Sequence, residues 1–240
     1  MARRGRLVAV EGGSASGKTT LVAQAARTHD WRALPEAFDR LDPAPSLEFA
    51  SAHELARLEA TLLAEEARRY REARRLCASG VTVLADTGFL GPLTYTFGLV
   101  KLGLAPVSVA TSLTTRARSM VRAGRLGIPD LTVYLRTTSR ERVDRARAST
   151  SRHPPGLFAR HEAVGRFERR LFEREFSAVR PTGVRVLRAD RPTAVLAHRL
   201  GAIIRSDPMH PASRGEALAL LARLGRPVPA IRRSTVRPNR

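Results

Sequence analysis

The chain has 240 residues, of which 43% are hydrophobic, which fits one α/β domain with a sizeable core and at most a short appendage. Its formal charge of +20 comes mainly from arginine, because Lys18 and Lys101 are its only lysines, so an arginine-rich composition explains the charge more simply than a nucleic-acid partner. No run of about 18 apolar residues occurs, which excludes a membrane-spanning helix. The first apolar run is too short for a secretory signal, and the single cysteine, Cys77, cannot form an internal disulfide, so we expect a cytoplasmic protein.

Strand and helix signals alternate along the chain. Short apolar runs predict buried strands at residues 7–10, 32–35, 81–85, 131–135 and 184–187. Apolar residues at helical spacing predict helices at residues 18–28, 53–78, 107–125, 139–148, 157–178, 194–204 and 215–224. This alternation predicts an α/β fold of three layers, with a parallel sheet of about five strands and helices on both faces.

Several element boundaries depend on one or two residues. The dipeptide Gly91-Pro92 predicts a break within the loop and helical segments of residues 87–103. The helix that starts at Ser139 has a Ser-x-x-Arg opening rather than a full capping box. A polar loop at residues 149–156 is expected to follow it.

The regular alternation ends near residue 205. We expect residues 1–205 to form one domain with a lid near residues 145–160. Residues 206–240 are expected to form a C-terminal extension, a short helix followed by a basic tail whose Pro and Arg content is typical of segments that bury little apolar surface.

A glycine-rich segment follows the first predicted strand. Residues 12–19 fit the pattern Gly-x-x-x-x-Gly-Lys-[Ser/Thr] at every position, between an apolar strand and a helix. The glycines let backbone N–H groups turn inward to form an anion-binding nest, Lys18 adds a point charge for the phosphates, and the Thr19 hydroxyl can ligate Mg²⁺. The motif therefore predicts ATP and Mg²⁺ binding rather than a chance turn, through Gly13, Ser14, Ala15, Ser16, Gly17, Lys18, Thr19 and Thr20.

Two carboxylates follow predicted strands, where ligands of open parallel sheets bind. Asp86 ends the strand at residues 81–85, and Glu36 follows the extended segment after the first helix. Transfer to a hydroxyl needs a carboxylate that accepts a proton and carboxylate or water ligands for Mg²⁺. We favour Glu36 as the base and Asp86 as the carboxylate for Mg²⁺ or substrate, with the reverse assignment open. The structural alternatives are a capping role for Asp86 and a solvated loop acid for Glu36.

Arginines gather in and after the helix that starts at Ser139. Guanidinium groups stabilise the charge that develops in phosphoryl transfer, and a closing loop that carries them excludes water. We therefore predict that Arg145, Arg147 and Arg152 act in catalysis from the lid. The alternative is a solvated basic helix face.

A family resemblance rests on two stretches of sequence. Residues 11–21 resemble the opening of thymidylate kinases and deoxynucleoside kinases. Residues 129–135, followed by Glu141-Arg142 and Arg145-x-Arg147, are similar to the strand and lid entry of thymidylate kinases. The resemblance spans residues 5–205 and implies a P-loop NTPase fold, the use of ATP and Mg²⁺, and often a homodimer.

Other positions depart from the thymidylate kinase pattern. Where that family has Asp-Arg-Tyr, this chain has Asp86-Thr87-Gly88, and the helix position that usually supplies an arginine to a nucleoside monophosphate is Glu65. Pro35-Glu36 is instead similar to the Pro-Glu of deoxynucleoside kinases, whose glutamate activates a sugar hydroxyl. These departures disfavour thymidine monophosphate and indicate an acceptor with a free hydroxyl.

Together these observations predict an ATP-dependent phosphotransferase. It would move the γ-phosphate to a hydroxyl of a small molecule, a nucleoside or nucleoside-like metabolite, with an antibiotic or specialised metabolite as the alternative acceptor. Two hypotheses of other classes are a nucleic-acid-associated or regulatory NTPase and a nucleotide-binding scaffold without an acceptor site. They differ in whether ADP release responds to a small alcohol, to nucleic acid or to neither.

Overall fold

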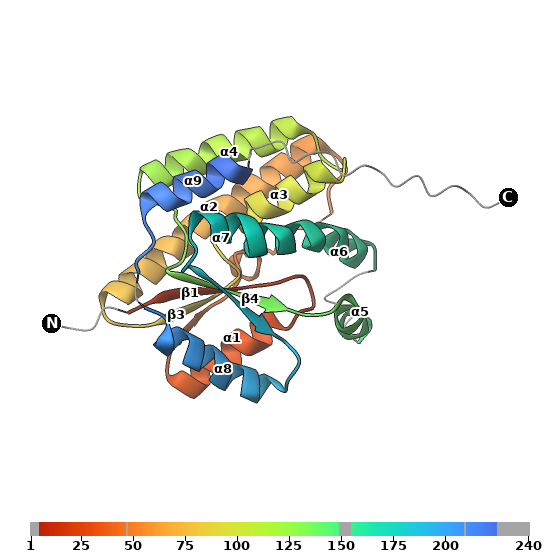
Figure 1. Ribbon diagram of the computed structural model, residues 1–240. Coiled ribbons are helices and arrows are strands. Elements are labelled where there is room, and N and C mark those ends of the chain that lie inside the picture. Colours follow the sequence, from red (N-terminus) through yellow and green to blue (C-terminus); the bar gives the residue numbers. More distant parts are fainter. Residues whose placement is uncertain (1–4, 47, 149–154, 209, 225–240) are drawn as a thin grey trace.

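One parallel sheet of five strands organises the molecule. The computed structural model describes residues 5–46, 48–148, 155–208 and 210–224. The strands are β1 (Leu7–Glu11), β2 (Arg32–Leu34), β3 (Val83–Asp86), β4 (Leu131–Arg136) and β5 (Val184–Arg188), in the spatial order β2-β3-β1-β4-β5. The predicted three-layer α/β fold is confirmed, since every pairing in this sheet is parallel and helices cover both of its faces (Figure 1).

The two faces of the sheet carry different sets of helices (Figure 1). The helices α1 (Lys18–His29) and α8 (Thr193–Ser206) lie side by side on one face. The opposite face carries the long α2 (Ala52–Ala78) and, packed with it, α3 (Gly91–Lys101), α4 (Val107–Arg122), α6 (Pro155–Arg170), α7 (Ser177–Val179) and α9 (Arg214–Leu224). Beyond the carboxyl end of β4 lies α5 (Ser139–Arg147). Two short segments, η1 (Phe38–Arg40) and the π-helical η2 (Leu171–Phe176), complete the list.

Alternation along the central strand explains the two cores. Leu7 and Ala9 of β1 belong to the core under α2, whereas Val8 and Val10 belong to the core under α1 and α8. All four side chains are fully buried, so β1 is apolar on both faces, as expected for a central parallel strand. Among the described residues, none of the helices is both long and apolar enough to cross a membrane.

Two predicted boundaries are wrong for local reasons. Gly91-Pro92 does not break a helix but starts α3, because proline lacks an N–H and tolerates the first helical turn, where no internal partner is needed. The helix α5 has a full capping box, which starts one residue earlier than expected. The Thr138 hydroxyl accepts a hydrogen bond from the Glu141 N–H at 3.2 Å, and the Glu141 carboxylate accepts one from the Thr138 N–H at 2.9 Å.

Two further boundaries also differ from the prediction. The predicted loop at residues 149–156 ends earlier, because α6 begins at Pro155; residues 149–154 lie outside the described residues. The single helix predicted at residues 157–178 consists of α6, the π-helical η2 and α7. Within η2, Phe172 and Phe176 are buried with their ring centroids 4.7 Å apart, so this irregular segment still supplies core residues.

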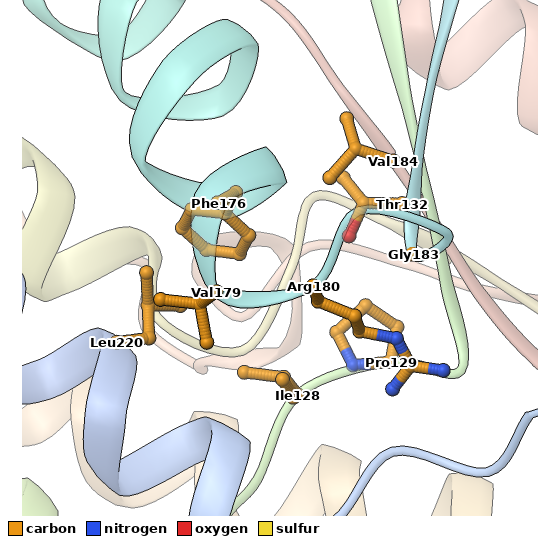
Figure 2. A pocket seen from close by; sticks show the side chains of 9 residues that line it. All are labelled: Ile128, Pro129, Thr132, Phe176, Val179, Arg180, Gly183, Val184 and Leu220. Carbon is orange, nitrogen blue, oxygen red and sulfur yellow. The ribbon is translucent and has the colours of Figure 1, made fainter.

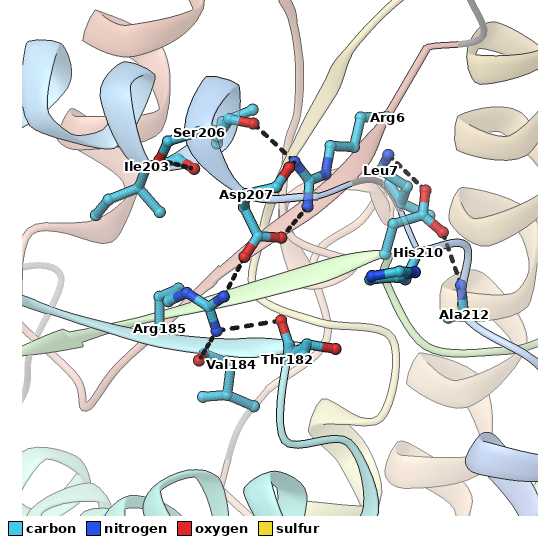
Figure 3. Close-up of polar contacts among 12 residues, drawn as sticks. Arg6, Leu7, Thr182, Val184, Arg185, Ile203, Ser206, Asp207, His210 and Ala212 are labelled. Atoms are coloured by element: carbon cyan, nitrogen blue, oxygen red, sulfur yellow. Dashed lines mark hydrogen bonds and ion pairs between the residues drawn. The ribbon is translucent and has the colours of Figure 1, made fainter.

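Polar contacts join the chain beyond residue 205 to the amino ends of the strands. Asp207 is buried and forms ion pairs with Arg6, just before β1, and with Arg185 in β5 (Figure 3). The Asp130 carboxylate accepts hydrogen bonds from the N–H groups of Leu7, at 2.9 Å, and Ala212, at 3.1 Å. The predicted short helix at residues 215–224 is present as α9, and its Leu220, Leu221 and Leu224 are buried in the core under α2.

A small hollow lies at this same end of the sheet. It encloses about 10 Å³ between β4, β5 and α9, and its lining includes Ile128, Phe176 and Leu220 (Figure 2). A volume of this size holds about one water molecule. This hollow is therefore too small for an organic ligand.

Candidate active site

The loop between β1 and α1 has the backbone geometry of an anion nest. Ala15 and Gly17 have positive φ angles of 58° and 94°, which turn successive N–H groups toward the inside of the loop. The Ser16 N–H donates to the Gly13 carbonyl at 3.1 Å, and the Leu21 N–H donates to the Gly17 carbonyl at 3.0 Å. The loop therefore closes on itself and leads directly into the N-terminus of α1, whose dipole favours an anion.

The side chains of this loop include one lysine and several hydroxyl groups. Lys18 folds back over the loop, and its Nζ donates to the carbonyls of Gly12, at 2.9 Å, and Gly13, at 3.4 Å. The Ser16 hydroxyl is buried and has no hydrogen-bond partner among the described residues. The remaining predicted loop positions are accessible: Ser14 and Ala15 are half-buried, and Thr19 and Thr20 are exposed.

Three neighbouring strands each carry a carboxylate at the carboxyl edge of the sheet. Glu11 is the last residue of β1, Asp86 is the last residue of β3, and Glu36 lies two residues after β2. Because β2, β3 and β1 are adjacent and parallel, these three side chains lie at one edge. Glu36 and Asp86, which are 50 positions apart, are thereby brought within electrostatic range of each other, and Glu36 is also within range of Lys18.

Asp86 is the most unusual of these acids. Its side chain is 2% exposed, yet neither carboxylate oxygen has a hydrogen-bond partner among the described residues. The guanidinium of Arg69, on α2, donates to the Asp86 backbone carbonyl at 2.8 Å and forms an ion pair with Glu66. An ionised carboxylate is costly to bury without partners, so the Asp86 side chain calls for a partner that the described residues do not supply.

Burial raises the pKa of the neighbouring glutamates. Desolvation raises the pKa of Glu36, and the nearby Asp86 raises it further, against the opposing effect of Lys18. Glu11 accepts a hydrogen bond from the Gly88 N–H at 2.7 Å, but burial and the charge of Glu168 still raise its pKa to about 8. Burial raises the pKa of Glu168, on α6, to about 7.

Two arginines of α5 contact the phosphate loop. Arg145 donates to the Ser16 carbonyl at 2.7 Å. Arg142 is buried, forms an ion pair with Glu162 at 2.8 Å, and lies so close to Gly13 that a Cβ there would be 2.3 Å from its Nη1. Of the other predicted lid residues, Arg147 is exposed at the end of α5 and Arg152 lies outside the described residues.

Several residues of this site were missed by the sequence prediction. Arg142 was part of the Glu141-Arg142 pair in the lid-entry resemblance, but the prediction assigned the catalytic role to Arg145, Arg147 and Arg152. Glu11 precedes the glycine-rich loop and is also visible in the sequence. Glu66, Arg69 and Glu168 belong to helices whose spacing indicates only buried faces, so their position near the strand ends could not be predicted from the sequence.

The Glu65 carboxylate is paired with two arginines of the chain. Its side chain is buried and forms ion pairs at 2.9 Å with Arg40, on η1, and with Arg68, on the next turn of α2. The arginine of this helix that reaches the strand ends is instead Arg69, one turn further along.

This combination of phosphate loop, parallel sheet and flanking arginine helix is the fold of the P-loop nucleoside and nucleotide kinases. Among solved structures, the chain is similar to a deoxyadenosine kinase from M. mycoides with bound dATP, at 14% identity and a TM-score of 0.64, over 83% of this chain and 99% of the other. It is also similar to a thymidylate kinase from Candida albicans, at 15% identity and a TM-score of 0.57, over 88% of this chain and 99% of the other. The sequence matches no protein-family model and no curated protein. The fold implied by the sequence resemblance is therefore confirmed.

Proposed function

We propose that this protein is an ATP-dependent phosphotransferase that moves the γ-phosphate to a hydroxyl of a small molecule, a nucleoside or a nucleoside-like metabolite. The observation that carries the proposal is the placement of Glu36 and Asp86 at the ends of neighbouring strands beside an anion nest, with Glu36 within electrostatic range of Lys18. A phosphate loop alone would fit any nucleotide-binding protein. Two free carboxylates beside it fit a reaction in which an alcohol must be oriented and deprotonated.

Binding of the nucleotide is assigned to the loop and to α5. The inward N–H groups and Lys18 would hold the phosphates, with Lys18 exchanging its carbonyl contacts for phosphate oxygens. Arg142 and Arg145 contact the loop from α5 and would stabilise the charge of the transferred group. Roles for Arg147 and Arg152 remain part of this proposal, as residues of a lid near residues 145–160.

The residues present fit a bound Mg²⁺. Asp86 offers two buried carboxylate oxygens that have no hydrogen-bond partner in the described ranges, and the Thr19 hydroxyl lies on the first turn of α1. When bound with ATP, Mg²⁺ neutralises part of the phosphate charge. Glu36 then serves as the base, because a raised pKa makes its carboxylate a better proton acceptor for an alcohol held beside it. We also propose a cytoplasmic location and, from the resemblance, a homodimer.

An ADP-release screen tests this function. Purified full-length protein is incubated with Mg²⁺, ATP and one candidate at a time: nucleosides, nucleoside monophosphates, or aminoglycoside- and phenicol-like alcohols. We expect one class of hydroxyl compound to stimulate ADP formation. Calorimetry that detects no binding of ATP or GTP to the folded protein in the presence of Mg²⁺ would contradict the proposal.

A nucleic-acid-associated NTPase is the second candidate, and one surface feature favours it. A groove of about 590 Å³ along α2 is lined by Arg40, Arg68, Arg71, Arg74 and Arg75. Acidic side chains already pair with part of this set, because Arg40 contacts Glu72 at 2.8 Å and Arg74 contacts Asp130 at 2.8 Å. Stimulation of ADP release by DNA or RNA, with steep salt dependence, would favour this candidate.

A further inference from the structure

The turn that follows β3 has a strained backbone. Thr87, the residue after Asp86, has a φ angle of 61°, in the left-handed region that β-branched residues seldom adopt. The Thr87 N–H donates to the Val10 carbonyl at 3.1 Å, and the Thr87 hydroxyl donates to the Asp86 carbonyl at 2.6 Å. The next N–H, of Gly88, donates to the Glu11 carboxylate at 2.7 Å. Strain of this kind persists only where the surroundings hold it, and it gathers at functional sites.

A buried arginine supports the same turn from α2. The Arg69 side chain is fully buried, and its guanidinium donates to the Asp86 carbonyl at 2.8 Å. The guanidinium also forms an ion pair with Glu66 and lies 5.3 Å from the centroid of the Phe89 ring. Because a buried charge is costly unless it is paired, these contacts hold Arg69 in one orientation. The Asp86 carbonyl therefore accepts hydrogen bonds from two side chains, Arg69 and Thr87, that belong to different parts of the fold.

The alternation of side chains along β3 separates the Asp86 carboxylate from α2. Ala85 belongs to the core under α2, whereas Leu84 belongs to the core under α1 and α8. Asp86 follows Leu84 to the α1 face, and Thr19 lies on the first turn of that helix. Arg69 reaches only the backbone of Asp86, and within the described ranges the carboxylate oxygens have no hydrogen-bond partner. The chain thus fixes the backbone of Asp86 and leaves its carboxylate available.

We propose that Arg69 and Thr87 are positioning residues for Asp86, which hold its backbone carbonyl so that the carboxylate remains available to Mg²⁺. The inference rests on the proposed function, which assigns Asp86 to Mg²⁺, and adds the two residues that orient it. Groups that hydrogen-bond to a metal-binding residue set its orientation, and their loss weakens metal binding by about 10 to 100-fold. Gly88 supports the turn, because a Cβ there would be 2.4 Å from the Oε1 of Glu11.

Calorimetry with and without Mg²⁺ tests this inference. A non-hydrolysable ATP analogue is titrated into the full-length protein in Mg²⁺ and in EDTA, and the ratio of the two dissociation constants measures what Mg²⁺ adds to the affinity. Asp86→Asn sets the ratio expected when the carboxylate contact is lost. We expect Arg69→Met and Thr87→Gly to lower the ratio by about tenfold, toward that of Asp86→Asn, with little change in the affinity measured in EDTA.

Two further variants separate positioning from a general loss of structure. Thr87→Ser keeps the hydroxyl and should keep the ratio close to that of the wild type. Arg57→Met, at an exposed position of α2, is the matched control for Arg69→Met and should leave the ratio unchanged. Circular dichroism checks the fold of each variant. Glycine adopts a positive φ angle without strain, so Thr87→Gly keeps the test decisive where Arg69→Met does not fold.

A wild-type ratio in folded Thr87→Gly overturns the inference. So does a loss of affinity that is equal in Mg²⁺ and in EDTA, because a merely structural role would weaken both. A wild-type ratio in Asp86→Asn overturns it as well, since Asp86 would then not serve Mg²⁺. If the ratio falls as expected but no acceptor stimulates ADP release, the inference stands and the proposed function fails. If an acceptor stimulates ADP release and the ratio does not change, the proposed function stands without the inference.

Discussion

The proposed phosphate side of the site consists of the loop at residues 12–19 with Arg145, and the proposed acceptor side contains Glu11, Glu36 and Asp86. The two sides differ in how their polar groups are paired. On the phosphate side, Lys18 and Arg145 already hydrogen-bond to loop carbonyls, so the cations are held in place before any ligand arrives. On the acceptor side, the buried Asp86 carboxylate has no hydrogen-bond partner in the part of the chain that the structure describes, and burial raises the pKa of Glu36 and Glu11. The difference indicates that the phosphate side is preorganised, whereas the acceptor side depends on its ligand for charge balance.

Substitution of Lys18, on the phosphate side, should lower the activity most. Lys18→Ala should lower kcat by about 10³-fold or more, because the phosphates lose their only lysine contact in the loop, while the fold persists. ADP release and circular dichroism measure the two effects. Lys101→Ala, at the exposed end of α3, is the matched control and should retain activity. Activity of Lys18→Ala close to wild type would remove the basis of the assignment.

The next effect separates the two acids of the acceptor side. Glu36→Gln should lower kcat by about 10² to 10⁴-fold with little change in ATP affinity, because a general base acts on the alcohol and not on the nucleotide. Asp86→Asn should instead weaken the dependence on Mg²⁺. Kinetics over a range of Mg²⁺ concentrations distinguishes them, and the opposite pattern would assign the base to Asp86.

A smaller effect is expected from the α5 arginines. Arg142→Ala should lower kcat by about 10 to 100-fold, since its guanidinium lies over Gly13 and would face the transferred group. Arg147→Ala, an exposed position on the same helix, should change kcat less than about threefold if α5 acts through its buried arginine. Steady-state kinetics of both variants decides, and equal losses would favour a lid in which both arginines close over ATP.

The smallest effect concerns the stability contributed by a buried acid on α2. Glu59 is 2% exposed on α2, and burial alone raises its pKa from 4.5 to about 8. A raised native pKa means that its contribution to stability is present below about pH 4.5 and is lost as the pH rises toward 8. Glu59→Gln should therefore raise the free energy of unfolding at pH 9 by about 1–3 kcal/mol and change it little at pH 5.

Urea unfolding of wild type and Glu59→Gln at both pH values measures this difference. Glu175→Gln, at an exposed position, should leave the pH dependence unchanged. A loss of stability in Glu59→Gln at pH 9 would show that the buried carboxyl is satisfied in the native state and would weaken the contrast between the two sides.

The fold class and the glycine-rich loop could both be predicted from the sequence alone. Short apolar runs alternating with helical periodicity allow few arrangements other than a parallel sheet covered on both faces, because each strand must bury two faces. The motif from Gly12 to Thr19 specifies its own backbone shape through local conformational preferences, so it needs no tertiary information to be recognised. Glu36 and Asp86 could also be selected, because strand ends are visible in the sequence.

The other side chains that meet at the carboxyl ends of the strands could be identified only from the packing of the helices. Arg69, Glu66 and Glu168 lie on helices whose sequence spacing defines a buried face but not its partner, and the packing of α2 and α6 over the sheet brings them to the strand ends. The helix starts at Thr138 and Pro92 depend on which backbone N–H groups in the first turn need a hydrogen-bond partner. Helix propensity alone does not show this. Burial and charge act through space, so the electrostatic contrast between the two sides of the site has no counterpart in the order of residues along the chain.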